Sequence, residues 1–146
     1  MLQRVKRASV TLPSGECRAT GQGLLVLLGV GREDAEQDAV RLAAKTLKLR
    51  IFSNAAGKFD HSVSDVKGDL LVISQFTLYG DCSDGNRPDF TASAPPERAT
   101  KLYLLYVREL ERSGLAVRVG EFGEHMKVEL LNDGPVTILL DSCAKK

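Results

Sequence analysis

The first half of the chain carries apolar patterns that are typical of β-strands. Residues 2–12 alternate loosely between apolar and polar side chains, Pro13-Ser14-Gly15 has the composition of a turn, and residues 17–20 are expected to pair back. The continuous apolar run 24–30 predicts a buried strand, and the β-branched run 70–74 predicts another. This part of the chain is therefore expected to supply strands of a sheet.

Two segments have the three-and-four spacing of amphipathic helices. From Glu33 to about Leu49 apolar residues recur on one helical face, with acidic residues in the expected first turn and basic residues in the last. A second helix is predicted over residues 99–110, with Pro95-Pro96 at its start and Ser113-Gly114 at its end. The tyrosines on its apolar face favour core or interface packing over the alternative of base stacking.

The C-terminal part returns to strand patterns. Residues 115–119, 126–131 and 136–140 each predict a strand, and clean alternation in the second indicates one wet face. Residues 80–94 form the longest irregular stretch, and loops of this length tend to be functional or mobile. Five or more strands with two helices predict one mixed α/β domain over residues 1–146, with a curled or barrel-like sheet.

Composition narrows the class of protein. A chain of 146 residues with 43% hydrophobic content can bury one core. No stretch is apolar enough to span a membrane and no secretory segment opens the chain, so a cytoplasmic protein is expected. Cys17, Cys82 and Cys143 are widely spaced and odd in number, as expected for free thiols. His61 and His125 stand alone, which indicates no metal site, no cofactor and no Ser/His triad.

The net charge of +1 argues against a large nucleic-acid footprint, because proteins that neutralise many phosphates have a strong basic excess. Local basic clusters remain on the first strand (Arg4, Lys6) and at residues 45–50. The second cluster also has a purely structural explanation, because positive charge stabilises the C-terminus of any helix.

Two polar segments stand at the ends of predicted strands, where binding sites are commonly built: Ser74-Gln75-Phe76-Thr77-Leu78 and Asn132-Asp133-Gly134-Pro135-Val136-Thr137. Taken alone, the second is typical of a hairpin turn, because Asp-Gly and Gly-Pro are ordinary turn dipeptides. Taken alone, Phe76 and Thr77 are typical strand residues. Thr77 is a candidate nucleophile, but its hydroxyl needs an activating base, and the neighbouring sequence supplies none.

Taken together, the two segments resemble the paired signatures of the D-aminoacyl-tRNA deacylases, the D-tyrosyl-tRNA(Tyr) deacylase family, which hydrolyse the ester between a D-amino acid and tRNA. The resemblance continues in order through Gln3-Arg4-Val5, residues 23–30, Arg50-Ile51-Phe52 and Asn86-Arg87-Pro88. A sister group with other substrates begins its first signature with Pro and has an aromatic residue after Gly-Pro. Ser74 and Val136 occupy those places here, so the chain is similar to the D-specific group.

The resemblance implies a homodimer that acts on the acceptor end of tRNA. Backbone N–H groups of Phe76 and Thr77 would hold the developing oxyanion, and the 2′-OH of the terminal adenosine would help to activate water. The Gly134-Pro135 bond would be cis and would cross into the partner's site, so that L-aminoacyl-tRNA is rejected while D-aminoacyl-tRNA and mischarged glycyl-tRNA are hydrolysed. Because an aminoacyl ester is already labile, positioning and charge stabilisation suffice for such an enzyme.

Further site residues follow from the same resemblance. Arg4 would brace the Gly-Pro segment, Phe122 and Met126 would enclose the terminal adenine, and Gln75 and Thr137 would order the pocket by hydrogen bonding. Without the resemblance, Arg4 is equally a surface strand residue, and packing in the core explains Phe122 and Met126.

Two other classes of protein compete with the enzyme: a module that binds an RNA end or a nucleotide without turnover, and a purely structural dimer. A deacylase needs both signatures at one pocket, whereas a binding module could dispense with Gly134-Pro135. That pair favours the enzyme.

Overall fold

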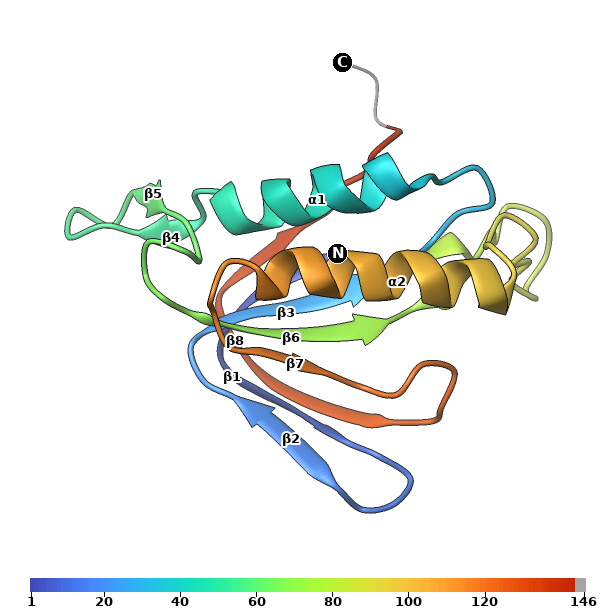
Figure 1. Cartoon of the computed structure of the whole chain (residues 1–146), viewed down its shortest axis with the longest axis horizontal. Coiled ribbons are helices and arrows are strands. Elements are labelled where there is room, and N and C mark those ends of the chain that lie inside the picture. The colour runs from blue at the N-terminus through green and yellow to red at the C-terminus, as the bar shows by residue number, and fades with distance from the viewer. Residues whose placement is uncertain (144–146) are drawn as a thin grey trace.

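The computed structural model describes residues 1–143 and shows a strongly curled mixed sheet with two helices on one side of it (Figure 1). The sheet has six strands in the order β2-β1-β3-β6-β7, and β8 pairs with the other edge of β1. Its strands are β1 (Leu2–Thr11), β2 (Cys17–Thr20), β3 (Gly23–Leu28), β6 (Asp69–Ser74), β7 (Val117–Val119) and β8 (Lys127–Ile138). The helices are α1 (Glu36–Lys48) and α2 (Pro96–Glu111), and β4 (Phe52–Ser53) and β5 (Phe59–His61) form a separate hairpin. The predicted barrel-like α/β fold is confirmed.

The central strands explain the continuous apolar runs of the sequence. β3 and β6 are parallel, as are β6 and β7, and such pairs need long crossovers, which here contain α1 and α2. Leu24 and Leu70 pack toward the helices, where they meet Tyr106. Leu25 and Leu71 belong to a second buried cluster on the other face. Strands buried on both faces have no polar side to alternate with.

Helix α1 begins later than the sequence predicts. Its first residue is Glu36, and the side chain of Asp38 accepts a hydrogen bond from the N–H of Ala35 at 2.8 Å. Asp34, which was expected in the first turn, lies before the helix and accepts from the N–H of Gly31 at 2.7 Å. The sequence places acidic residues near the start of the helix, but it does not show which of them lies in the first turn and which binds the preceding loop.

Strand β8 runs without interruption from Lys127 to Ile138 and so joins most of the predicted strands 126–131 and 136–140, which means that the prediction of two separate strands is wrong. Gln3 of β1 pairs with Thr137 and Val5 pairs with Asn132, and this shift in register means that the residues between them bulge from the ladder. Gly134 and Pro135 therefore lie in a bulge within one long strand. The alternative reading of a hairpin turn is wrong as well.

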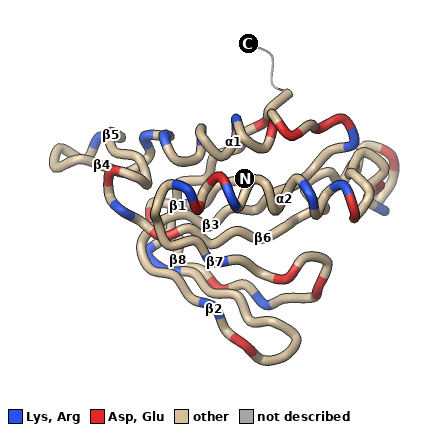
Figure 2. The backbone as a smooth tube through the Cα atoms, in the orientation of Figure 1, with Lys and Arg blue, Asp and Glu red and all other residues tan. Residues whose placement is uncertain are grey.

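Basic and acidic residues are interspersed along the chain (Figure 2). Lys6 pairs with Asp133 at 3.5 Å, and Arg50, which lies beyond the end of α1, pairs with Asp60 and lowers the pKa of that carboxyl. Arg4 also lies 3.8 Å from the carboxylate of Asp133, so three of the basic residues in the clusters have acidic partners. Within residues 1–143 no helix has the length and apolar character needed to cross a membrane, and the three cysteines are free and exposed.

Candidate active site

The first polar segment leaves the sheet where β6 ends. The N–H of Gln75 donates to the carbonyl of Leu28 at 2.8 Å, which extends the pairing of β3 with β6 by one residue. The chain then turns into the short 3-10 helix η1 (Phe76–Tyr79). Phe76 and Thr77 are thus helical, and their interpretation as strand residues is wrong. The first N–H groups of a helix have no carbonyl partner within it, and in the part of the chain that the structure describes no backbone carbonyl accepts from the N–H of Phe76 or Thr77, so both can bind an oxygen atom.

The side chain of Thr77 is exposed, and its hydroxyl accepts a hydrogen bond from the side-chain amide of Gln75. The hydrogen bonds found within residues 1–143 bring neither an imidazole nor a carboxylate to this hydroxyl. An alcohol without a base is a weak nucleophile. The local geometry therefore favours chemistry by the backbone of η1 over attack by the Thr77 side chain.

An open pocket of about 270 Å³ lies beside η1. Five predicted site residues line it together: Ser74, Gln75, Phe76, Phe122 and Met126. The other lining residues come from the end of β3 and the loop after it, from β6, from α2 and the segment before it, and from the β7–β8 connection and the start of β8: Leu28, Val30, Ile73, Ser93, Ala99, Tyr103, Gly123, Glu124, His125 and Val128. Segments that are far apart in sequence thus form one apolar cavity with polar groups on its wall, as small-molecule sites commonly do.

Aromatic side chains shape this pocket. The exposed ring of Phe76 meets Phe90 edge to face, with ring centroids 5.1 Å apart. Phe122 lies tilted against Tyr103 at 5.9 Å, and the Tyr103 hydroxyl donates to the backbone carbonyl of Val72 at 3.0 Å. Burial raises the pKa of Tyr103 to about 12, so it keeps its proton at neutral pH. The wall of the pocket is therefore flat, apolar and uncharged at this point, which suits a planar ring.

Phe122 and Met126 are both core residues and pocket residues, which are the two alternatives that the sequence left open for them. Each is partly buried against a core cluster, and each also lines the pocket. The sulfur of Met126 accepts from the N–H of Glu121 at 3.3 Å. A Cβ on Gly120 would lie 2.6 Å from that sulfur, so the thioether packs closely against the backbone of Gly120.

The second polar segment forms a separate group. Gly134 and Pro135 are exposed in the bulge of β8, and the peptide bond between them is cis. Arg4, only 9% exposed, donates to the carbonyls of Asp133 at 2.9 Å and Ile51 at 2.8 Å. The alternative of Arg4 as a surface residue is therefore wrong. A Cβ on Gly134 would lie 3.2 Å from Nη2 of Arg4, which leaves little space for a side chain.

Five of the ten predicted site residues do not line the pocket within one chain. Among the residues that the structure describes, the lining lacks Thr77, which follows Phe76 in η1, and it lacks Arg4, Gly134, Pro135 and Thr137. The hydroxyl of Thr137 donates to the side-chain carbonyl of Gln3, its neighbour across β1 and β8. One chain thus presents a pocket next to η1 and, apart from it, an exposed Gly-Pro segment braced by Arg4.

The sequence interpretation did not identify His125 and Tyr103 as pocket residues. Within residues 1–143 no group of three or more histidine, cysteine or acidic side chains could hold a metal ion, and only its position next to Met126 connects His125 with the site. Tyr103 lies on the apolar face of α2, where core packing is the ordinary expectation, and it does pack in the core while its edge reaches the pocket.

Comparison with known proteins adds the following findings. The sequence model of the D-Tyr-tRNA(Tyr) deacylase family matches residues 1–141. D-aminoacyl-tRNA deacylases of Roseiflexus sp. and Heliobacterium modesticaldum are 53% and 51% identical to the chain, over 97% of it and over 92% and 94% of their own lengths. Of solved structures, one titled c-Myc DNA unwinding element binding protein is 42% identical, with a TM-score of 0.89 over 98% of this chain and 97% of its own. A probable eukaryotic D-amino acid tRNA deacylase, at 16% identity and a TM-score of 0.78 over 92% of this chain and 93% of its own, shares the fold.

Proposed function

The chain belongs to the D-Tyr-tRNA(Tyr) deacylase family and is an enzyme that hydrolyses the ester of D-aminoacyl-tRNA, and we propose that its two polar segments divide this reaction between them. The segment at η1 stabilises the transition state, and the Gly134-Pro135 segment selects the substrate. The observation that carries the proposal is the pocket that Ser74, Gln75 and Phe76 form with two apolar side chains next to the free N–H end of η1.

Chemistry at η1 requires no side-chain nucleophile. The backbone N–H groups of Phe76 and Thr77 hold the oxygen that becomes negative as water attacks the ester, and an oxyanion donor of this kind contributes about 2.7–4 kcal/mol. The 2′-OH of the terminal adenosine helps to activate the water. Phe122 and Met126 enclose the adenine, for which their apolar surfaces are suited, and stacking contributes roughly 1–3 kcal/mol per base.

Selection uses the segment that is exposed in the single chain. In a homodimer, Gly134-Pro135 of one subunit enters the pocket of its partner, and its carbonyl groups contact the substrate amino group and leave no space for an L side chain. Arg4 supports this arrangement, because its buried guanidinium holds the carbonyl of Asp133, next to Gly134. Glycyl-tRNA escapes rejection, since glycine has no side chain to exclude. We further propose that the deacylase domain spans residues 1–146 and acts in the cytoplasm.

A subunit-mixing experiment tests the arrangement across the dimer. Gly134→Leu damages the selecting segment and leaves the pocket of its own chain intact, whereas Ser74→Trp fills the pocket and leaves the segment intact. Each homodimer should be inactive. After the two are dissociated, mixed and refolded together, heterodimers contain one undamaged site, and statistical mixing should restore about a quarter of wild-type activity.

The control is each variant taken alone through the same procedure, with dimer mass and melting temperature measured by sedimentation and calorimetry. Met126→Trp serves as a second pocket lesion with a different side chain. A site that lies within one chain cannot be restored by a partner chain. Heterodimers that remain inactive, both with Ser74→Trp and with Met126→Trp as the pocket lesion, would therefore contradict a site shared between subunits.

A further inference from the structure

Tyr79, the last residue of η1, lies on the loop that follows β3. Its ring is so close to this loop that a Cβ on Gly29 would be 3.1 Å from Cε2, and a Cβ on Gly31 would be 2.7 Å from the hydroxyl oxygen. Neither glycine has a positive φ. Close approach of the ring, rather than an unusual backbone conformation, is therefore the reason why these two positions exclude a side chain.

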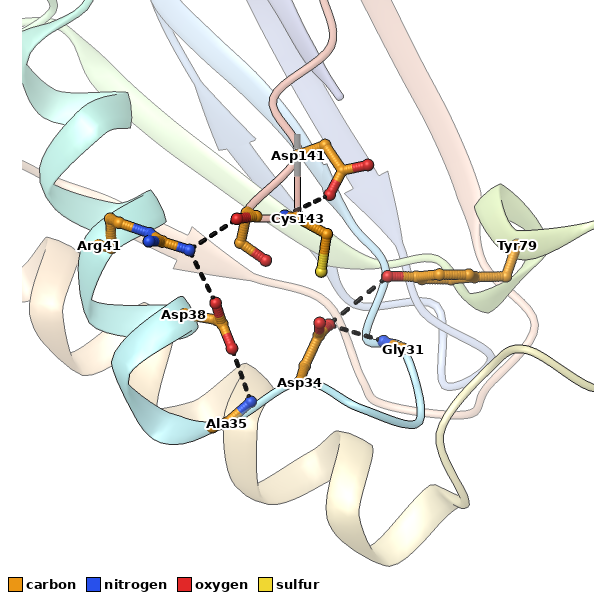
Figure 3. A network of polar contacts seen from close by, with 9 residues as sticks. Gly31, Asp34, Ala35, Asp38, Arg41, Tyr79, Asp141 and Cys143 are labelled. Atoms are coloured by element: carbon orange, nitrogen blue, oxygen red, sulfur yellow. Dashed lines mark hydrogen bonds and ion pairs between the residues drawn. The ribbon is translucent and has the colours of Figure 1, made fainter. Parts of the chain in front are cut away.

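Asp34 adds a polar link between the loop and η1. Figure 3 shows its carboxylate between the N–H of Gly31 and the hydroxyl of Tyr79, and the same oxygen accepts from both, at 2.7 Å and 3.5 Å. Burial, with the nearby Asp34 charge, raises the pKa of Tyr79 to about 12, so the hydroxyl remains a donor at neutral pH. Because a bond of 3.5 Å is at the limit for hydrogen bonding, ring packing is the stronger contact.

The other side-chain contacts of η1 lie at the surface: the ring of Phe76 meets Phe90, and the side-chain amide of Gln75 donates to the Thr77 hydroxyl. Phe76, Thr77 and Leu78 are exposed, whereas Tyr79 is half-buried. At the other end of η1, Gln75 is fixed by its N–H to the carbonyl of Leu28. A Cβ on Gly29 would also lie 3.2 Å from the carbonyl of Gln75, so this glycine contacts both ends of the turn.

We propose that Tyr79 is a positioning residue, whose ring, seated on Gly29 and Gly31, fixes the orientation of the N–H groups of Phe76 and Thr77. This inference rests on the proposed function, in which those N–H groups bind the oxyanion. Tyr79 does not line the pocket next to Phe122 and Met126, so it acts on the site through η1. Its loss should lower kcat, because a misplaced donor weakens transition-state binding, and should leave KM unchanged.

The first comparison is between two substitutions of Tyr79. Tyr79→Phe keeps the ring and should retain nearly wild-type kcat. Tyr79→Leu removes it and should lower kcat by about 10- to 100-fold at constant KM, the range expected for a displaced donor. Tyr106→Phe, which loses the bond between the Tyr106 hydroxyl and Thr46 in the core, controls for destabilisation and should lower the melting temperature without lowering kcat.

A second pair of variants tests the contact itself. Gly31→Ala places a methyl group against the Tyr79 hydroxyl and should lower kcat, and adding Tyr79→Phe removes the clashing oxygen and should recover a large part of the loss. Gly21→Ala is the matched control, because its Cβ would meet only a carboxylate oxygen at an ordinary 3.5 Å. Rescue would identify the Tyr79 ring as the group that the methyl meets, and melting temperatures of all the variants show whether a change in kcat occurs without loss of stability.

Amide chemical shifts of Phe76 and Thr77, measured by NMR, give a readout that does not depend on activity. They should move in Gly31→Ala and return toward wild type in the double variant. Unmoved shifts in Gly31→Ala and Tyr79→Leu would overturn the role of Tyr79 whatever the activity. Failure of the unmodified protein to hydrolyse D-aminoacyl-tRNA would instead refute the proposed function. If the unmodified protein is active and Tyr79→Leu has the same kcat, only the role of Tyr79 is refuted.

Discussion

Thr77→Ala separates catalysis by the backbone from catalysis by a side-chain nucleophile. The substitution leaves the N–H of residue 77 in place and removes one exposed hydrogen bond, the one from the side-chain amide of Gln75. Such a bond has a net value of about 0.5–1.5 kcal/mol. Even if all of it were expressed in the transition state, kcat would fall by no more than about 10-fold.

Removal of a true nucleophile lowers kcat far more, by a factor on the order of 10⁶ in a serine protease. The assay is single-turnover hydrolysis of D-aminoacyl-tRNA with enzyme in excess, so that product release does not mask the chemical step. Thr77→Ser and Thr77→Val serve as controls, since the first restores a hydroxyl and the second keeps the shape. A loss above about 10⁴-fold in Ala and Val that Ser restores would refute the backbone mechanism.

Three further substitutions probe the other parts of the site. Gly134→Ala introduces a Cβ at a backbone φ of 134° and 3.2 Å from Nη2 of Arg4. It should lower hydrolysis of all substrates, measured in parallel assays, and lower the free energy of unfolding by about 1–3 kcal/mol in denaturant titrations. Arg4→Met leaves two backbone carbonyls without their donor and should lower the free energy of unfolding by about 2–5 kcal/mol in urea titrations; an unchanged midpoint would contradict the brace. Phe122→Ala should raise KM about 5- to 150-fold, the equivalent of one lost base stack, with kcat less affected in steady-state kinetics.

Much of the fold could be predicted because its signals are local. The continuous apolar runs at β3 and β6 predict strands buried on both faces, and the spacing of apolar residues in α2 predicts one face against the sheet. The course of β8 was not predictable in this way. Gly134-Pro135 has the local signature of a turn, and pairing with β1, more than a hundred residues away in sequence, carries the strand through it.

The site depends even more on distant contacts. Phe76 and Thr77 have the β propensity of strand residues, yet the chain leaves the sheet after Gln75 and forms η1, where the ring of Tyr79 rests on the loop after β3. The resemblance supplied the pairing of Phe122 with the first signature, which no local pattern indicates. His125 was missed because a single histidine carries no spacing information.

We propose that this chain hydrolyses aminoacyl esters by backbone stabilisation of the oxyanion and selects its substrate by excluding the L side chain. Hydrolysis of D-, L- and glycyl-tRNA by the purified protein, measured in parallel at equal concentrations, tests it most directly. We expect rapid release of D-amino acids and glycine and negligible release of L-amino acids. Equal rates on the D and L esters of the same amino acid would contradict it.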